Sequence, residues 1–304
     1  MKKVAILIMM GDVEPSLRNV EAFKDTVIKY CELNKDNLNH EYKFFTYKYG
    51  DSVVCYPDDN FSILTNLEFI GKESVFDTFE KTRWALSYVK SSYNPDVYIR
   101  VNISTHINIP LLDVIVDELD MNFVYSNRIC NFTNVKSDYF GYVYPRGDFM
   151  MFGKKHCDDI IIYGKKYEYS EYNNGVEHID DCLIGMCLLD GNPEYYKYMK
   201  MLRYNFVPGE HVEPEKCYIN AIASRLKTTP PGKCSGYSWD DNNYRLYDVG
   251  KFYEIQSLVE TVKHDRGDID DVFVETKYQV MFFNHSEVNF EQYCNYINEI
   301  KAGQ

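Results

Sequence analysis

The segment Val4-Ala-Ile-Leu-Ile-Met-Met10 is a short, continuous apolar run that ends at Gly11-Asp12. A run of this length, closed by a glycine, is typical of a buried strand of a parallel sheet that leads into a loop. The segment Asp96-Val-Tyr-Ile-Arg-Val101 has the same character and follows Pro95. The two segments therefore predict two buried strands, and the second leads into a polar stretch.

Helix and strand patterns alternate around these strands. The apolar spacing predicts helices at 16–30, 75–90 and 110–119, and strands at 40–48, 122–126, 139–144 and 149–152. Such alternation is typical of an α/β fold, with a mostly parallel central sheet flanked by helices. The periodicity weakens after Cys187, and residues 227–239 have the composition of a loop. We therefore expect a single domain with an irregular C-terminal third.

The overall composition excludes several classes of protein. The chain has 33 Lys and Arg residues against 46 Asp and Glu residues, which gives a formal net charge of −13. This charge, without a basic stripe, argues against nucleic-acid binding. No apolar run reaches membrane-spanning length, and no cleavage site follows the first run. The nine cysteines are scattered and include no C-x-x-C pair, which suits a reducing compartment. We expect a soluble, cytoplasmic protein.

Two polar segments are candidates for chemistry. Asn102 to Thr105 follows a predicted strand, and α/β sheets bind ligands at the carboxyl ends of their strands. A polar turn has the same pattern. Asp180 and Asp181 precede an apolar stretch, where the helix dipole favours acids. An acid that apolar neighbours partly shield can also act as a general base.

Residue type and spacing alone do not assign a function to several other residues. Lys81 lies on a predicted helix, where an isolated lysine is usually exposed to solvent. His156, His178 and His285 have no zinc-type spacing. The sequence also lacks G-x-x-x-x-G-K-[ST], G-x-G-x-x-G and G-x-S-x-G. Walker-type nucleoside triphosphatases, Rossmann dehydrogenases and α/β-hydrolases therefore lose their usual support.

The order of five short segments indicates a family. The segments are Ala22-Phe-Lys24-Asp-Thr26, Gly50-Asp51-Ser-Val-Val54, Phe79-Glu-Lys81-Thr82, Tyr98-Ile-Arg100-Val-Asn102-Ile-Ser104 and Asp180-Asp181-Cys-Leu-Ile-Gly185-Met-Cys187-Leu188. They resemble, in order, A-I-R-x-T, G-D-I-[IL], L-x-K-T, [FY]-[IL]-[KR]-[TV]-D-D-D and E-D-V-x-x-G-x-C-L. These are motifs of GT-A glycosyltransferases of the β-1,3-galactosyltransferase-like kind, including relatives in bacterial capsule clusters and large DNA viruses. The last segment is the most specific match.

The resemblance implies a GT-A-type, Rossmann-like fold. It also implies that the protein transfers a sugar, with inversion, from a nucleotide-sugar donor to a hydroxyl of a glycan acceptor, and a UDP-sugar is the first candidate for the donor. Asp181 is then the general base, and Asp180 caps the helix or orients the acceptor. Gly147, Asp148 and His178 fall on the acceptor side. The residues expected at the donor are Gly11, Lys24, Asp51, Lys81, Arg100, Asn102 and Ser104.

The same resemblance implies a division of the domain. Residues 1–130 correspond to the nucleotide-sugar-binding half and residues 131–240 to the acceptor and catalytic half. Residues 241–304 form a C-terminal extension that is expected to pack on the domain. The product would be a capsule or viral glycan, and a viral protein would act in the host cytoplasm. The sequence does not indicate an oligomeric state.

One departure from the family concerns the metal. The D-D-D motif is replaced by Asn102-Ile103-Ser104, whose side chains are neutral and weak ligands for Mg²⁺ or Mn²⁺. Either the nucleotide and other groups hold the metal, with His285 as a candidate ligand, or positive side chains replace it. Lys24, Lys81 and Arg100 are the candidates for neutralising the diphosphate. An ordinary strand-end histidine is the simpler interpretation of His285.

Two alternatives remain open at this stage. A sugar nucleotidyltransferase shares the topology, but the loop after its first strand is usually basic and glycine-rich, whereas Met10 to Glu14 is acidic. A catalytically inactive, glycosyltransferase-like module that only binds carbohydrate would explain the missing metal ligand. Nucleotide binding separates that module from an enzyme.

Overall fold

The structure is a computed structural model. It describes residues 1–10, 14–49, 54–55, 61–66, 77–131, 142–145, 149–167, 180–206, 219–226, 242–262 and 264. Among these residues, no helix is long and apolar enough to cross a membrane.

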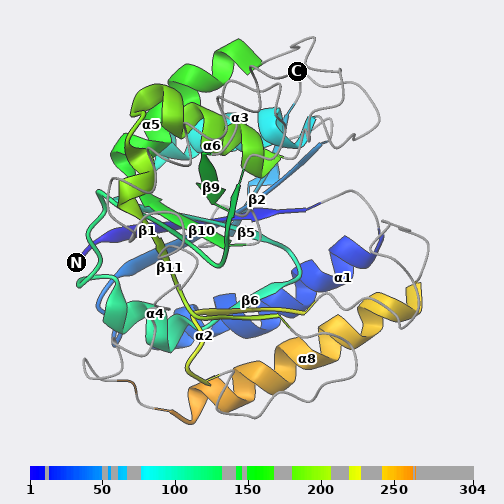
Figure 1. The fold of residues 1–304 in the computed structure, drawn as a ribbon. Helices are drawn as coiled ribbons and strands as arrows, with labels where there is room; N and C mark the ends of the chain where they lie inside the picture. Colours follow the sequence, from blue (N-terminus) through cyan, green and yellow to red (C-terminus); the bar gives the residue numbers. More distant parts are fainter. Residues whose placement is uncertain are drawn as a thin grey trace.

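An eight-stranded sheet forms the centre of the molecule, in the order β11-β7-β10-β5-β1-β2-β4-β3 (Figure 1). Its strands are β1 (Lys3–Met9), β2 (Glu41–Tyr49), β3 (Val54–Cys55), β4 (Phe61–Asn66), β5 (Val97–Asn102), β7 (Val124–Ser126), β10 (Phe149–Gly153) and β11 (Met199–Met201). β1 lies parallel to both β2 and β5, and only β10 and β3 run against their neighbours. The predicted mostly parallel sheet is confirmed.

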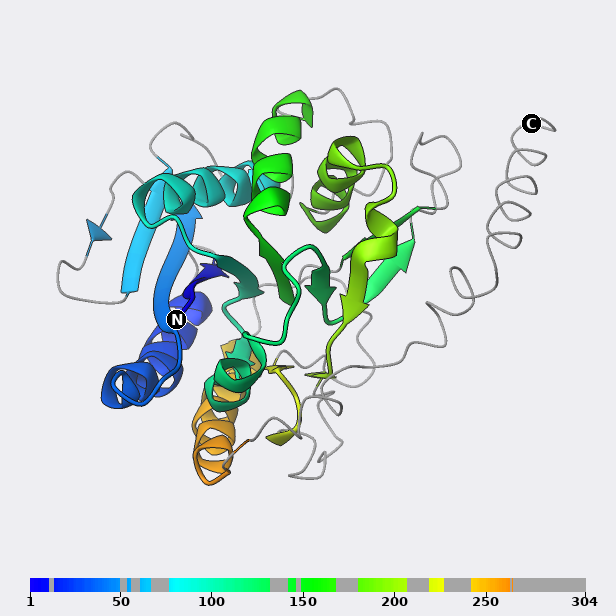
Figure 2. The same cartoon turned by 90° about the vertical axis from the view of Figure 1, so that its left-hand side faces the viewer.

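Helices cover both faces of this sheet. On one face lie α3 (Asp77–Ser92), α5 (Lys154–Tyr163) and α6 (Asp180–Gly191), and they pack on the buried side chains of Ala5 and Leu7. On the other face, Ile6 and Ile8 pack with α1 (Glu14–Phe23), the π-helix η1 (Lys24–Ile28), α2 (Lys29–Asn34), α4 (Ile109–Ile115) and α8 (Asn242–Glu260). The three layers are visible in two perpendicular views (Figures 1 and 2). The strict alternation within β1 explains why its sequence is apolar on both faces.

A small sheet lies on the same side as α8. It has the order β12-β13-β6, with β6 (Thr105–Ile107), β12 (Tyr204–Phe206) and β13 (Ala223–Arg225). Asn108 attaches β13 to the rest of the fold, because its Nδ2 donates to the carbonyls of Ile219 and Ala221, at 2.8 and 3.3 Å. Its Oδ1 also accepts from the Leu111 amide and caps α4. A third, two-stranded sheet pairs β8 (Ile129–Asn131) with β9 (Val143–Pro145).

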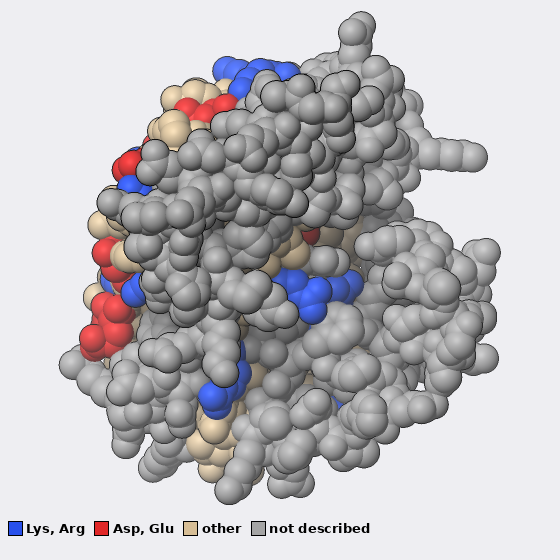
Figure 3. Space-filling view, in the orientation of Figure 1, with Lys and Arg blue, Asp and Glu red and all other residues tan. Residues whose placement is uncertain are grey.

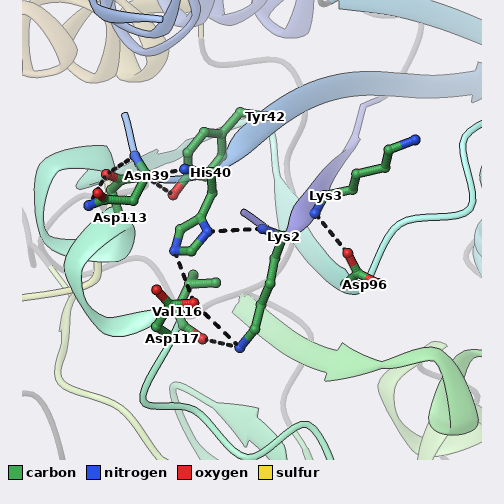
Figure 4. Close-up of polar contacts among 9 residues, drawn as sticks. All are labelled: Lys2, Lys3, Asn39, His40, Tyr42, Asp96, Asp113, Val116 and Asp117. Carbon is green, nitrogen blue, oxygen red and sulfur yellow. Dashed lines mark hydrogen bonds and ion pairs between the residues drawn. The ribbon is translucent and has the colours of Figure 1, made fainter. Parts of the chain in front are cut away.

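The amino-terminal ends of β1, β2 and β5 form one edge of the central sheet. Side-chain hydrogen bonds connect this edge to the neighbouring helix α4 (Figure 4). The Asp113 carboxylate accepts from the amides of Asn39 and His40 and from the Tyr42 hydroxyl. Just before β1, the Lys2 side-chain amine donates to the Val116 carbonyl at 2.7 Å. These bonds fix the amino-terminal edge of the sheet to α4 and the turn after it.

Most predicted strands and helices are present, with ends that shift by a few residues. Among the described residues, helices α5 and α8 and the strands β4, β6, β8, β11, β12 and β13 were not predicted. α5 begins directly after Gly153, the last residue of β10, so no turn residues separate the two elements. The strands β6, β8, β11, β12 and β13 have only three residues each, which is too short for an alternating pattern to reveal them.

Candidate active site

The opposite, carboxyl-terminal edge of the sheet brings polar side chains together. Met9 at the end of β1 lies beside Tyr47 of β2 and Asn102 of β5. Because these three strands are parallel, their carboxyl ends meet at one edge, where open α/β sheets bind ligands. The candidate site is the group of ionisable side chains at this edge.

Arg100 and Asp180 form the centre of the group. Arg100 lies on β5 and Asp180 on the first turn of α6, and the Arg100 Nη2 atom donates to Asp180 Oδ2. Arg100 is 1% exposed and Asp180 is 5% exposed, so both charges are taken out of water. The guanidinium also contacts Met9 Sδ at 3.1 Å. A buried ion pair between a strand and a helix fixes where α6 begins relative to the end of β5.

Lys81 reaches the same edge from α3. Its side chain is buried, and Nζ donates to the Met10 carbonyl oxygen at 3.0 Å. An isolated lysine on a helix is usually exposed to solvent, and this expectation is wrong for Lys81. Its neighbour Thr82 is also buried and lies 3.2 Å from the Tyr47 hydroxyl. α3 thus directs a charge and a hydroxyl at the ends of β1 and β2.

Asp181 stands beside Asp180 on the first turn of α6 and is 6% exposed. α6 is apolar on all sides, and every residue from Asp180 to Leu189 is buried. A helix of this kind lies inside a protein, so its acidic first turn is held within the fold. Burial is the main cause of the raised pKa of Tyr144 on β9, and Asp181 adds to that rise, as it does to the raised pKa of Arg100.

Burial and charge act against each other in this group. Burial alone would lower the pKa of Arg100, but Asp180, Tyr47 and Asp181 raise it above its ordinary value, so the guanidinium stays charged. Burial raises the pKa of the Tyr47 hydroxyl, although Arg100 and Thr82 oppose the shift. Buried ionisable groups are costly unless they are paired, and their concentration at a strand edge indicates a functional site.

The surface on this side is hollowed. Figure 3 shows Lys and Arg side chains gathered in a hollow between the upper and the lower helices. Positive charge in a concave site favours an anionic ligand, because low-dielectric walls strengthen its field.

The residues described do not fit a divalent metal ion. Asn102 and Ser104 supply only neutral oxygens, and Ser104 uses its backbone carbonyl to accept from the Leu226 amide at 2.8 Å. Within the described ranges, no group of three or more His, Cys, Asp or Glu side chains could hold a metal. Mg²⁺ and Mn²⁺ at a phosphate usually have a carboxylate ligand. We therefore derive no step through a metal ion.

The structure brings together four of the residues expected from the sequence: Lys81, Arg100, Asp180 and Asp181. Asn102 lies at the same edge, and Ser104 follows in the turn after β5. Lys24 is not joined to this group: it lies in η1, on the other face of the sheet, with Nζ 3.2 Å from Glu21. The other expected residues lie outside the described ranges: Gly11, Asp51, Gly147, Asp148, His178 and His285.

Sequence reasoning missed Tyr47 and Met9 and the role of Thr82. Tyr47 lies near the carboxyl end of the predicted strand 40–48, and aligning that strand with Val4–Met10 would have placed its hydroxyl at the site. The pairing of Arg100 with Asp180 was also missed, because 80 residues separate them and no local pattern links them.

No protein-family model matches this chain, and no curated protein matches it either. Several solved structures are similar. One is a glycosyltransferase involved in the glycosylation of the major capsid of PBCV-1, with 10% identity, 83% of this chain and 98% of that chain covered, and a TM-score of 0.44. The galactosyltransferase LgtC, solved with donor and acceptor sugar analogs, has 13% identity, covers 87% of this chain and 99% of its own, and has a TM-score of 0.44.

The glycosyltransferase GlyE of Streptococcus pneumoniae TIGR4 is 10% identical, with 86% of this chain covered and a TM-score of 0.42. The chain spans 64% of the length of that GlyE chain. All three solved proteins are glycosyltransferases.

Proposed function

We propose that this protein is a glycosyltransferase that moves a sugar from a nucleotide-sugar donor to a hydroxyl of a glycan acceptor. A UDP-sugar is the first candidate for the donor. The observation that carries the proposal is the buried group Lys81, Arg100, Asp180 and Asp181 at the carboxyl edge of the sheet. Three of the five family-like segments contribute these residues, although they are far apart in the sequence. A shared site explains why the segments occur together.

In the proposed reaction, the Asp181 carboxylate accepts the proton of the acceptor hydroxyl while that oxygen attacks the anomeric carbon. The bond from the anomeric carbon to the donor phosphate breaks, and the nucleoside diphosphate leaves with the electron pair. Attack opposite to the leaving group inverts the anomeric configuration. A sugar hydroxyl is too weak an acid to ionise alone at neutral pH, and a general base contributes roughly 10²–10⁴-fold.

The two carboxylates of the first turn of α6 have different parts in this proposal. Asp180 pairs with Arg100 and so fixes the start of α6. Asp181, one residue on, is placed for the acceptor hydroxyl. Lys81 provides positive charge for the departing diphosphate, because a buried ammonium attracts phosphate more strongly than an exposed one. We retain residues 1–130 as the donor half and residues 131–240 as the acceptor half.

Binding of nucleotides tests the proposal directly. In thermal-shift measurements, nucleoside diphosphates should raise the melting temperature, and UDP should raise it more than GDP or ADP. A ligand at a hundred times its dissociation constant stabilises the native state by about 2.7 kcal/mol, which such a measurement detects. No response to any nucleotide, together with binding of glycans, would contradict the proposal and favour a carbohydrate-binding module.

Lys81→Met tests the donor side of the site. Methionine keeps the length and apolar stem of lysine but removes the charge, so UDP binding should weaken by roughly tenfold, the size of one charge-assisted hydrogen bond. Lys90→Met is the matched control, because Lys90 lies on the same helix and pairs with Asp158 at the surface. Calorimetric titration with UDP measures both variants, and equal affinity in the two would show that Lys81 does not contact the donor.

A further inference from the structure

Arg225 comes from a part of the chain in which the sequence shows no family resemblance, yet it lies beside the proposed donor site. It ends β13, where it pairs with Thr105 of β6 in an antiparallel ladder. The next residue, Leu226, donates its amide to the Ser104 carbonyl at 2.8 Å. Ser104 and Thr105 follow directly after Asn102, the last residue of β5. An arginine is thereby fixed next to the end of the central strand.

The alternation of the small sheet shows which face carries Arg225. The His106 Nε2 atom lies 2.9 Å from Gln256 Oε1, and the His106 ring contacts Phe252, so His106 faces α8. Successive residues of a strand point to opposite faces, and residues that are directly paired share a face. Thr105 and Arg225 therefore lie on the face turned away from α8. The Arg225 side chain is partly buried there, with its Nε atom fully so.

The basic side chains at this edge of the sheet are matched in number by acidic ones, so a diphosphate needs further positive charge. The group contains two basic side chains, Lys81 and Arg100, and two acidic side chains, Asp180 and Asp181. Lys81 approaches from α3, whose Phe79 and Leu86 pack in the core cluster above the sheet. β13 belongs to the opposite face, because Ala223 and Leu226 pack in the other core cluster. Lys81 and Arg225 thus flank the end of β5 from the two faces of the sheet.

We infer that Arg225 binds the diphosphate of the nucleotide donor. Asn102 and Ser104 are neutral and weak ligands for a metal ion, and Arg225 supplies the positive charge in its place. This inference rests on the proposed function. A guanidinium offers two parallel N–H donors to a phosphate, which fits a diphosphate better than a point charge does. Basic side chains are visible in the hollow of Figure 3, between the helices of the two faces.

The test compares binding of UDP and uridine by calorimetric titration. Arg225→Gln should weaken UDP binding by roughly tenfold or more, because a hydrogen bond to a charged group is lost, and should change uridine binding by less than about twofold. Arg225→Lys should give an intermediate loss for UDP, because it keeps the charge and loses the fork, and this variant gives a result even if Arg225→Gln does not fold. Lys154→Gln is the control: it removes the same charge at the opposite edge, where Lys154 pairs with Asp96 at 2.9 Å.

Each outcome decides the inference. If the parent and Arg225→Gln bind UDP equally, the inference is overturned and the proposed function stands. Equal losses for UDP and uridine would show general damage to the site and would also overturn a contact with the diphosphate. If the parent binds neither UDP nor any other nucleoside diphosphate, the proposed function fails and the inference fails with it.

Discussion

Asp180 and Asp181 are adjacent in the sequence, but the structure gives them different surroundings. Asp180 is the ion-pair partner of a buried arginine, whereas Asp181 acts on Arg100 and Tyr144 from the next position. The first carboxylate is needed for the structure of the site, and the second is proposed for chemistry. Substitution to asparagine should therefore lower mainly the stability at Asp180 and mainly the turnover number at Asp181.

Asp181→Asn should lower the turnover number by roughly 10²–10⁴-fold, because the amide cannot accept the proton of the hydroxyl. Asparagine has the same shape and remains suited to the start of a helix, so the melting temperature should change little. The measurement is the turnover number at saturating donor, beside the melting temperature. Near-normal turnover in Asp181→Asn would remove this residue as the base.

Asp180→Asn should instead destabilise the fold, because it leaves the buried guanidinium of Arg100 without its carboxylate. Removing one partner of a buried ion pair typically costs about 3–5 kcal/mol. The matched control is Arg100→Met combined with Asp180→Leu, which removes both charges and should be clearly more stable than Asp180→Asn. Urea unfolding measures the parent and both variants, and a double variant no more stable than Asp180→Asn would show that the unpaired guanidinium does not cause the loss.

At the scale of elements, the sequence reveals apolar runs and motifs but does not reveal the shortest strands. β1 is predicted because it is a continuous apolar run, and β5 because only Arg100 interrupts its apolar residues. α6 is found by its acidic first turn and motif, since an all-apolar helix has no amphipathic period. β12 and β13 are not found, because three-residue strands have no readable alternation.

The candidate site shows the same limit. The motifs place Lys81, Arg100 and the two aspartates near one another, because each falls at the end of a strand or the start of a helix. The ion pair itself, and the approach of Arg225, depend on contacts between residues that are distant in sequence. Such contacts depend on packing of the whole core, which no local pattern encodes.

Asn108 is the residue on which two elements depend. It caps α4 through Oδ1 and holds the segment before β13 through Nδ2. Asn108→Ala should lower the free energy of unfolding by about 2 kcal/mol or more, since it removes the cap and leaves buried carbonyls unsatisfied. Asn108→Asp keeps the cap acceptor but loses the donors, so its loss should come only from the β13 contact. Urea unfolding compares them, and a neutral Asn108→Ala variant would contradict this double role.

At the scale of the whole molecule, the two edges of the central sheet differ in kind. The amino-terminal edge is closed by neutral and charged hydrogen bonds around Asp113 and Lys2. The carboxyl-terminal edge gathers buried charges from α3, β5 and α6. Because β5, β1 and β2 are parallel neighbours, one edge can stabilise the fold while the other holds the proposed site.

The stability of the whole chain should fall in mild acid, because histidines are buried in the neutral form. Burial lowers the pKa of His106 to about 4, against a smaller opposing effect of Gln256. Burial, assisted by Lys155, lowers the pKa of His156 to about 4 as well. The unfolded chain takes up a proton at each histidine below about pH 6.5, whereas the folded chain does so only near pH 4. Stability is therefore complete above pH 6.5 and is lost progressively as the pH falls toward 4.

Between pH 7.5 and 5.5, the free energy of unfolding should decrease by roughly 3 kcal/mol from these two groups, at about 1.4 kcal/mol per pH unit for each fully titrating site. Ordinary carboxylates titrate mostly below this interval, so their contribution is small. The double variant His106→Gln/His156→Gln cannot take up these protons and should lose less than half as much stability over the same interval. Urea unfolding at both pH values measures the difference. Equal losses in parent and variant would mean that other groups, His40 among them, carry the acid sensitivity.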